Sequence, residues 1–93
     1  MEQVKNQTKY DSSGTILLFY KYVDIKYPKQ ILKWQKELCE KLSLKGRIII
    51  AHEGINATVG GTTENIEAYV KEYLSHPLFK DSDIKRSAGS ADD

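Results

Sequence analysis

The arrangement of apolar and polar residues along the chain predicts strands and helices in alternation. Residues 15–23, 47–51 and 56–59 are short segments rich in β-branched, aromatic or small residues, as is typical of strands. Residues 28–43 begin with a proline, which suits a first helical turn. Their apolar residues fall on one helical stripe, so this segment is predicted to be an amphipathic helix.

A second helix follows the glycine pair Gly60-Gly61, with a threonine able to cap its first turn. Its apolar residues fit the helical template at every position: Ile66, Tyr69, Val70, Tyr73 and Leu74. The dipeptide His76-Pro77 is expected to end the helix. Residues 83–88 predict a short, polar fourth strand at an edge of the sheet.

This β-α-β-β-α-β order predicts an α+β, ferredoxin-like fold, in which two helices cover one face of a four-stranded antiparallel sheet. The length of 93 residues suits one small domain. We assign the domain to residues 15–88, after a flexible leader at 1–14. The flexible end at 89–93 is small and polar, which is consistent with truncation of a longer protein.

The first strand carries apolar residues on both of its faces. Alternation divides the strand into two sets, Ile16, Leu18, Tyr20 and Tyr22 against Leu17, Phe19, Lys21 and Val23. Because lysine favours solvent, we expect the helices to cover the tyrosine face and the Lys21 face to stay open. The triple isoleucine at 48–50 predicts burial of the second strand on both faces.

Composition and charge narrow the possible functions. The formal net charge is +1, so attraction to nucleic acid or anionic lipid would need a local basic patch. The single cysteine, Cys39, lies on the apolar stripe of the first helix, where we expect a small buried hydrophobe rather than a nucleophile. No apolar run approaches the ~18 residues of a membrane span, and no secretory signal is visible. We therefore expect a cytoplasmic protein without cofactor or membrane contact.

The segment His52-Glu53-Gly54-Ile55-Asn56 concentrates the polar chemistry of the chain. A catalytic or metal role is disfavoured, because adjacent strand residues point to opposite faces and no HExxH spacing exists. Glu53-Gly54 instead matches a two-residue hairpin turn. Gly60-Gly61 lacks a phosphate-loop motif, so we expect it to form a flexible connection between the third strand and the second helix. The sequence therefore predicts neither catalytic nor metal-binding residues.

The open face of the sheet is the remaining candidate surface. Exposed aromatic residues there could stack RNA bases, and several basic residues could contact phosphates: Lys45, Arg47, Lys85 and Arg86. The same apolar surface could dock a neighbouring domain. Domain docking is favoured, because the RNA-recognition consensus is absent and the second strand offers isoleucines rather than aromatics.

Two segments carry a family resemblance: FYKYVDI at 19–25 and GRIIIAHEGINATVGG at 46–61. They resemble the N-terminal domain of the rhodanese-domain tRNA uridine hydroxylases, whose animal relatives are named thiosulfate sulfurtransferase/rhodanese-like domain-containing proteins. The AHEGIN hexapeptide is the most specific mark. The resemblance spans residues 15–88 and implies an acylphosphatase-like, ferredoxin-type fold. It also implies a reactive cysteine in a downstream rhodanese domain, and Cys39 does not match that residue.

The resemblance implies a non-catalytic domain that positions tRNA, docks on the downstream rhodanese domain, or does both. The expected RNA-binding or domain-interface residues are Lys21, Arg47, His52, Glu53, Gly54 and Asn56. Two alternatives stay open. One is a small acylphosphatase-type hydrolase that depends on Arg47 and Asn56, and the other is a pure protein-interaction module. Whether the parent protein is a sulfurtransferase or a tRNA uridine hydroxylase also stays open.

Overall fold

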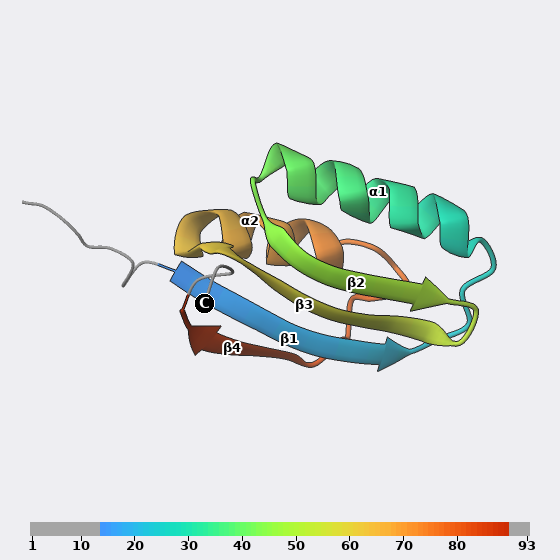
Figure 1. Cartoon of the computed structure of the whole chain (residues 1–93). Helices are drawn as coiled ribbons and strands as arrows, with labels where there is room; N and C mark the ends of the chain where they lie inside the picture. The colour runs from blue at the N-terminus through green and yellow to red at the C-terminus, as the bar shows by residue number, and fades with distance from the viewer. Residues whose placement is uncertain (1–13, 90–93) are drawn as a thin grey trace, which may run out of the picture.

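Four strands and two helices alternate in the order β-α-β-β-α-β in the computed structural model, which describes residues 14–89 (Figure 1). The elements are β1 (Gly14–Tyr22), α1 (Pro28–Lys41), β2 (Lys45–Ala51), β3 (Gly54–Thr62), α2 (Thr63–Leu74) and β4 (Ile84–Ala88). The predicted ferredoxin-like α+β fold is confirmed. Apart from Gly14 and Gly89, the predicted leader and the predicted end lie outside the described residues.

The sheet has the strand order β2-β3-β1-β4, and every neighbouring pair is antiparallel. Figure 1 shows α1 and α2 on the same side of this sheet. One face is therefore covered by helices and the other is open. Since β1 and β3 are the two central strands, they form the middle of both faces.

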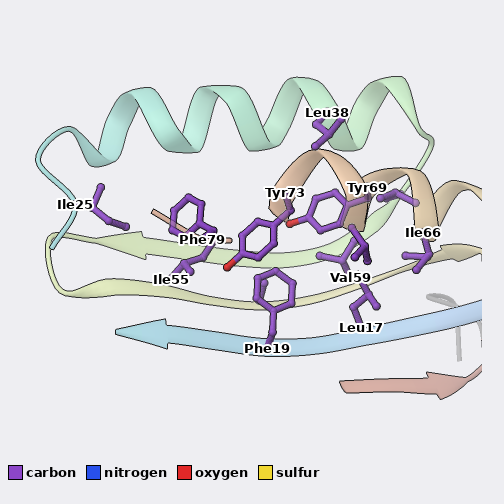
Figure 2. Close-up of a cluster of buried hydrophobic side chains, with 13 residues drawn as sticks. Leu17, Phe19, Ile25, Leu38, Ile55, Val59, Ile66, Tyr69, Tyr73 and Phe79 are labelled. Carbon is purple, nitrogen blue, oxygen red and sulfur yellow. The ribbon is translucent and has the colours of Figure 1, made fainter. Parts of the chain in front are cut away.

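The core lies between the sheet and the helices, as Figure 2 shows. Phe19 of β1 meets Tyr73 of α2, with ring centroids 4.7 Å apart, and Tyr73 stacks on Phe79 at 4.9 Å. The fully buried set also includes Leu17, Ile25, Val59, Ile66 and Tyr69. Such tilted and stacked ring contacts add to the stabilisation from burial alone.

Both helices form where the sequence predicts them. α1 begins at Pro28, and α2 is capped by Thr62, whose hydroxyl oxygen accepts a hydrogen bond from the Asn65 backbone N–H at 3.2 Å. The α2 stripe is buried as expected, and the helix ends at Leu74 before Pro77. Side-chain capping satisfies a donor that the first turn of a helix leaves unpaired.

The predicted orientation of β1 is wrong. Leu17 and Phe19 are buried under the helices, whereas Tyr20 and Tyr22 are 64% and 80% exposed on the open face. The cause is pairing with β3, whose apolar residues lie opposite Leu17, Phe19 and Lys21: Val59, Ala57 and Ile55. Both strands can bury their apolar sides together only in this orientation.

Lys21 therefore lies on the covered side of the sheet, at the end of β1. Its ammonium group pairs with the Asp81 carboxylate at 2.9 Å, and its side chain is one-quarter exposed. The expectation that Lys21 lies on the open face is wrong. Its long side chain reaches Asp81 at the periphery of the covered face.

The prediction that the second strand is buried on both faces is also wrong. β2 is an edge strand, and Ile49 is 53% exposed on the open face, while Ile48 and Ile50 are half-buried. The third strand is longer than the predicted 56–59. It includes Gly60-Gly61, which we expected to form a connection.

Candidate functional site

The open sheet face, as we call the side away from the helices, gathers exposed apolar and aromatic side chains. Strand alternation from the buried residues defines it. Its residues are Ile16, Leu18, Tyr20 and Tyr22 of β1, Lys45, Arg47, Ile49 and Ala51 of β2, Gly54, Asn56, Thr58 and Gly60 of β3, and Lys85 and Ser87 of β4. Four of these are large and apolar or aromatic and more than half exposed: Leu18, Tyr20, Tyr22 and Ile49. Contiguous exposed groups of this kind mark contact surfaces.

The register places Asn56 at the centre of one row across this face. Asn56 lies opposite Tyr20 on one side and opposite Ile49 on the other. Its side chain is exposed, and within residues 14–89 its carboxamide makes no hydrogen bond. A polar group that can both donate and accept thus lies free between an aromatic and an aliphatic side chain.

The next row toward the β2–β3 hairpin contains Tyr22, Gly54 and Ala51. A hollow of about 310 Å³ opens over these two rows. The rings of Tyr20 and Tyr22 border it and meet edge to face, with centroids 5.6 Å apart and planes at 64°. In this row Ala51 contributes only a methyl group and Gly54 contributes no side chain.

Basic residues lie at the other end of the open sheet face. Thr58 has Arg47 on one side and Leu18 on the other, and Lys85 lies next to Leu18. Within residues 14–89, Arg47 and Lys85 form no ion pair. Their charges therefore remain available to an anionic partner.

Arg86, which the sequence also offered as a phosphate contact, lies on the covered side. Its guanidinium donates two hydrogen bonds to the Glu67 carboxylate of α2, at 2.8 and 3.0 Å. The hydrogen bond from Arg86 lowers the pKa of Glu67, and the same bond raises the pKa of Arg86. This pair joins β4 to α2 and contributes nothing to the open sheet face.

The turn of the β2–β3 hairpin consists of His52 and Glu53, one residue earlier than predicted, and Gly54 pairs with Ala51. Gly54 has a φ of +151°, and a Cβ there would lie 2.1 Å from the backbone oxygen of Lys21. Only glycine fits such a conformation and such a close approach. The glycine of the AHEGIN hexapeptide is therefore required by the backbone.

His52 serves the scaffold rather than the hollow. Its Nδ1 lies 2.9 Å from the carbonyl oxygen of Ile25, so this nitrogen must carry the hydrogen and donate it. The Ile25 N–H donates in turn to the His52 carbonyl oxygen at 2.9 Å. These two bonds fix the segment after β1 against the hairpin. His52 is not among the residues that line the hollow.

The structure thus separates the predicted site residues into two groups. Glu53, Gly54 and Asn56 border the hollow, and Arg47 lies on the same face. Lys21 also borders the hollow, but its ammonium is held by Asp81, and His52 is held by Ile25.

Sequence reasoning missed the exposed large apolar and aromatic residues of this face, Leu18, Tyr20, Tyr22 and Ile49. The signal was present in residues 55–59, where apolar and polar residues alternate strictly. Because β3 is a central strand and one of its faces is polar, the same face of its neighbours β1 and β2 must also be open.

Chemistry elsewhere in the described chain is limited. Burial raises the pKa of the half-buried Cys39 thiol, which keeps it protonated and poorly nucleophilic at neutral pH. Residues 14–89 contain no cluster of three or more His, Cys, Asp or Glu able to hold a metal ion. No helix in the same range is long and apolar enough to cross a membrane.

Comparison with known proteins gives the family. Residues 14–93 match the family described as UPF0176 acylphosphatase like domain. The tRNA uridine(34) hydroxylase of Corynebacterium aurimucosum is 49% identical over 80 residues, which are 86% of this chain and 26% of that protein. The enzymes of the same name from Corynebacterium jeikeium and Corynebacterium diphtheriae are 49% and 45% identical over 84% and 88% of this chain.

The chain spans about a quarter of the length of these curated relatives. The resemblance that the AHEGIN hexapeptide carries is confirmed, and so is the acylphosphatase-like fold. The chain belongs to the UPF0176 acylphosphatase-like domain family, whose matched relatives are tRNA uridine(34) hydroxylases.

Proposed function

We propose that this chain is the tRNA-contacting domain of a tRNA-modifying enzyme, and that it binds RNA through the open sheet face. The observation that carries the proposal is the combination of Tyr20 and Tyr22 with Arg47 and Lys85 on one side of a rigid sheet. The names of the relatives supply the class of RNA.

Tyr20 and Tyr22 supply an aromatic stacking surface on the open sheet face. Unpaired RNA bases stack on exposed aromatic rings, and each such contact contributes about 1–3 kcal/mol. A tyrosine has only two side-chain torsions, so little conformational entropy is lost when a base stacks on it. The corrected orientation of β1 therefore shifts the balance from docking of a neighbouring domain toward RNA binding.

The charges support the same assignment. A net charge of +1 provides no general attraction to RNA, so affinity must come from a local cluster. Arg47 and Lys85 lie in one row with Thr58 and Leu18 and provide this charge, whereas the acidic Glu53 lies at the hairpin end of the open sheet face. Phosphate contacts are thus directed to the basic end, and bases to the tyrosine end.

The domain performs no chemistry of its own in this proposal. His52 is engaged with a backbone carbonyl, and the Cys39 thiol is protonated and half-buried. The reaction is assigned to the part of the parent enzyme outside this chain, since the relatives are about four times as long as the matched segment.

The test is the affinity of the chain for a fluorescently labelled tRNA anticodon stem-loop at several salt concentrations. Tyr20→Ala should weaken binding about 5- to 150-fold through lost stacking. Arg47→Ala should weaken binding and reduce the slope of log affinity against log salt by about 0.7, the value for one lost phosphate contact on a single strand. Both residues are exposed, so both variants should fold.

Two controls lie off the open sheet face. Tyr27 is an equally exposed tyrosine before α1, and Lys33 is an exposed cation on α1. Tyr27→Ala and Lys33→Ala should leave the affinity unchanged. Absence of stem-loop binding at low salt, or binding that none of these variants alters, would overturn the proposal.

A further inference from the structure

The geometry points to a single-nucleotide subsite: the hollow at the hairpin end of the open sheet face binds one unpaired RNA base, with the Asn56 carboxamide bonded to the edge of the base. This inference rests on the proposed RNA-binding function and adds which residues take the base. The hollow measures about 310 Å³ and lies beside both exposed tyrosines.

The floor of the subsite is backbone. Gly54 and Ala51 face one another across β3 and β2, so only one methyl group projects from this pair. The absence of a side chain at Gly54 is enforced by its φ of +151° and by the nearby Lys21 oxygen. A flat base can therefore lie closer to the sheet beside Tyr22 than in the row of Tyr20, Asn56 and Ile49, where every strand carries a larger side chain.

The walls are aromatic and aliphatic. Tyr22 flanks Gly54 on the β1 side, and Tyr20 and Ile49 project one row further along. Rows two residues apart on one strand are separated by about 7 Å. Tyr22 is 80% exposed, and among the rings of residues 14–89 its ring meets that of Tyr20 alone, edge to face, so it has room to rotate over a bound base.

Asn56 supplies the polar recognition. It lies between Tyr20 and Ile49, directly beside the hollow, and its carboxamide has no hydrogen-bond partner within residues 14–89. A carboxamide can donate one hydrogen bond and accept another on the same base edge. Uracil offers a matching N3–H donor next to a carbonyl acceptor. The class of ligand is therefore an unpaired nucleotide rather than a phosphate alone.

The backbone of the bound RNA continues toward the basic end. Arg47 projects from β2 one row beyond Ile49, about 7 Å along the strand. It makes no ion pair within residues 14–89, so its guanidinium can take the phosphate of the neighbouring nucleotide with two parallel hydrogen bonds. A base at the hollow and a phosphate at Arg47 together define the path of the bound RNA across the open sheet face.

The experiment compares two six-residue probes by fluorescence anisotropy, oligouridylate and an oligomer of the same ribose-phosphate backbone without bases. Oligouridylate should bind at least about tenfold more tightly, because stacking is lost in the abasic probe. Asn56→Ala should weaken oligouridylate binding severalfold and leave the abasic probe unaffected. Tyr22→Phe, which keeps the ring, should retain affinity, and Tyr22→Ala should lose it.

Gln30→Ala is the matched control and should leave the affinity for both probes unchanged, since Gln30 carries an exposed carboxamide on α1, away from the open sheet face. Equal affinity for both probes, or no effect of Asn56→Ala, would overturn the base subsite while stem-loop binding could persist through phosphate contacts. Absence of binding to the stem-loop and to both probes would instead overturn the proposed function itself.

Discussion

Tyr20 lies directly opposite Asn56 in the antiparallel pairing of β1 with β3, and both side chains are exposed on the open sheet face. The neighbouring pair, Phe19 with Ala57, is buried under the helices. The alternation that buries Phe19 therefore also exposes Tyr20. Core and candidate site are two consequences of one strand register.

This register predicts a large contrast between adjacent residues of β1. Phe19→Ala should lower the free energy of unfolding by about 3–5 kcal/mol, because it opens a cavity among Tyr69, Tyr73 and the sheet. Tyr20→Ala should change it by no more than about 0.5 kcal/mol. Urea denaturation followed by circular dichroism measures both. Comparable losses for the two variants would contradict the orientation of β1.

The hairpin glycine should be intolerant of substitution. Gly54→Ala places a methyl group 2.1 Å from the Lys21 oxygen and forces alanine into a φ of +151°. The backbone conformation alone costs about 1–3 kcal/mol, and the steric conflict adds to this cost. Thr58→Ala, at an exposed position of the same strand, serves as the control in urea denaturation. Wild-type stability for Gly54→Ala would refute the close approach of β1 to this residue.

A buried hydrogen bond couples α1 to α2. The Tyr69 hydroxyl donates to Oε1 of Gln35, which is fully buried, while Gln35 Nε2 has no partner within residues 14–89. Gln35→Leu leaves the buried Tyr69 hydroxyl without its hydrogen-bond acceptor, which should lower the free energy of unfolding by about 1–3 kcal/mol. The double variant Gln35→Leu/Tyr69→Phe removes both polar partners and should recover part of that loss.

A double-mutant cycle in urea isolates the coupling between these two residues. The sum of the two single losses should exceed the loss of the double variant. Strict additivity would show that the Gln35–Tyr69 hydrogen bond does not contribute to stability.

Alkaline pH should destabilise the domain through the same helix. Burial raises the pKa values of Tyr69 and Tyr73 above the usual value of 10. In the unfolded chain both phenols ionise near pH 10, whereas the folded state holds them neutral. The free energy of unfolding that the raised pKa values of the two phenols contribute is thus fully present below about pH 10. It is lost as the pH rises above that value.

Urea midpoints measured between pH 8 and 11 test this dependence. The wild type should lose stability steeply above pH 10, and Tyr69→Phe, though less stable at pH 8, should show a shallower decline. Equal slopes in this range would mean that Tyr69 ionises as readily in the folded state as in the unfolded chain.

The local signals were sufficient for the order of elements and for both helices. Pro28, the threonine cap and the regular apolar stripe of α2 act within a few residues, so sequence spacing captures them. The AHEGIN hexapeptide was sufficient to identify the family, and the comparisons confirm this identification.

The orientation of β1 could not be obtained in the same way, because both of its faces are apolar and only pairing with β3 decides between them. The alternation of residues 55–59 indicates the correct face of β1, whereas Lys21 indicates the wrong one, because its ammonium group pairs with Asp81 on the covered side. The candidate site followed this error. Arg47, Gly54 and Asn56 were found from the sequence, whereas Tyr20, Tyr22 and Ile49 needed the register.

The most direct test of RNA binding by the open sheet face is a titration of the ¹⁵N-labelled chain with an unlabelled tRNA anticodon stem-loop, followed by backbone amide shifts. If the open sheet face binds RNA, the largest shifts cluster at Tyr20, Tyr22, Arg47, Gly54 and Asn56, while exposed positions on α1 and α2 stay unchanged. Shifts confined to the helices, or none at saturating RNA, would contradict RNA binding by this face.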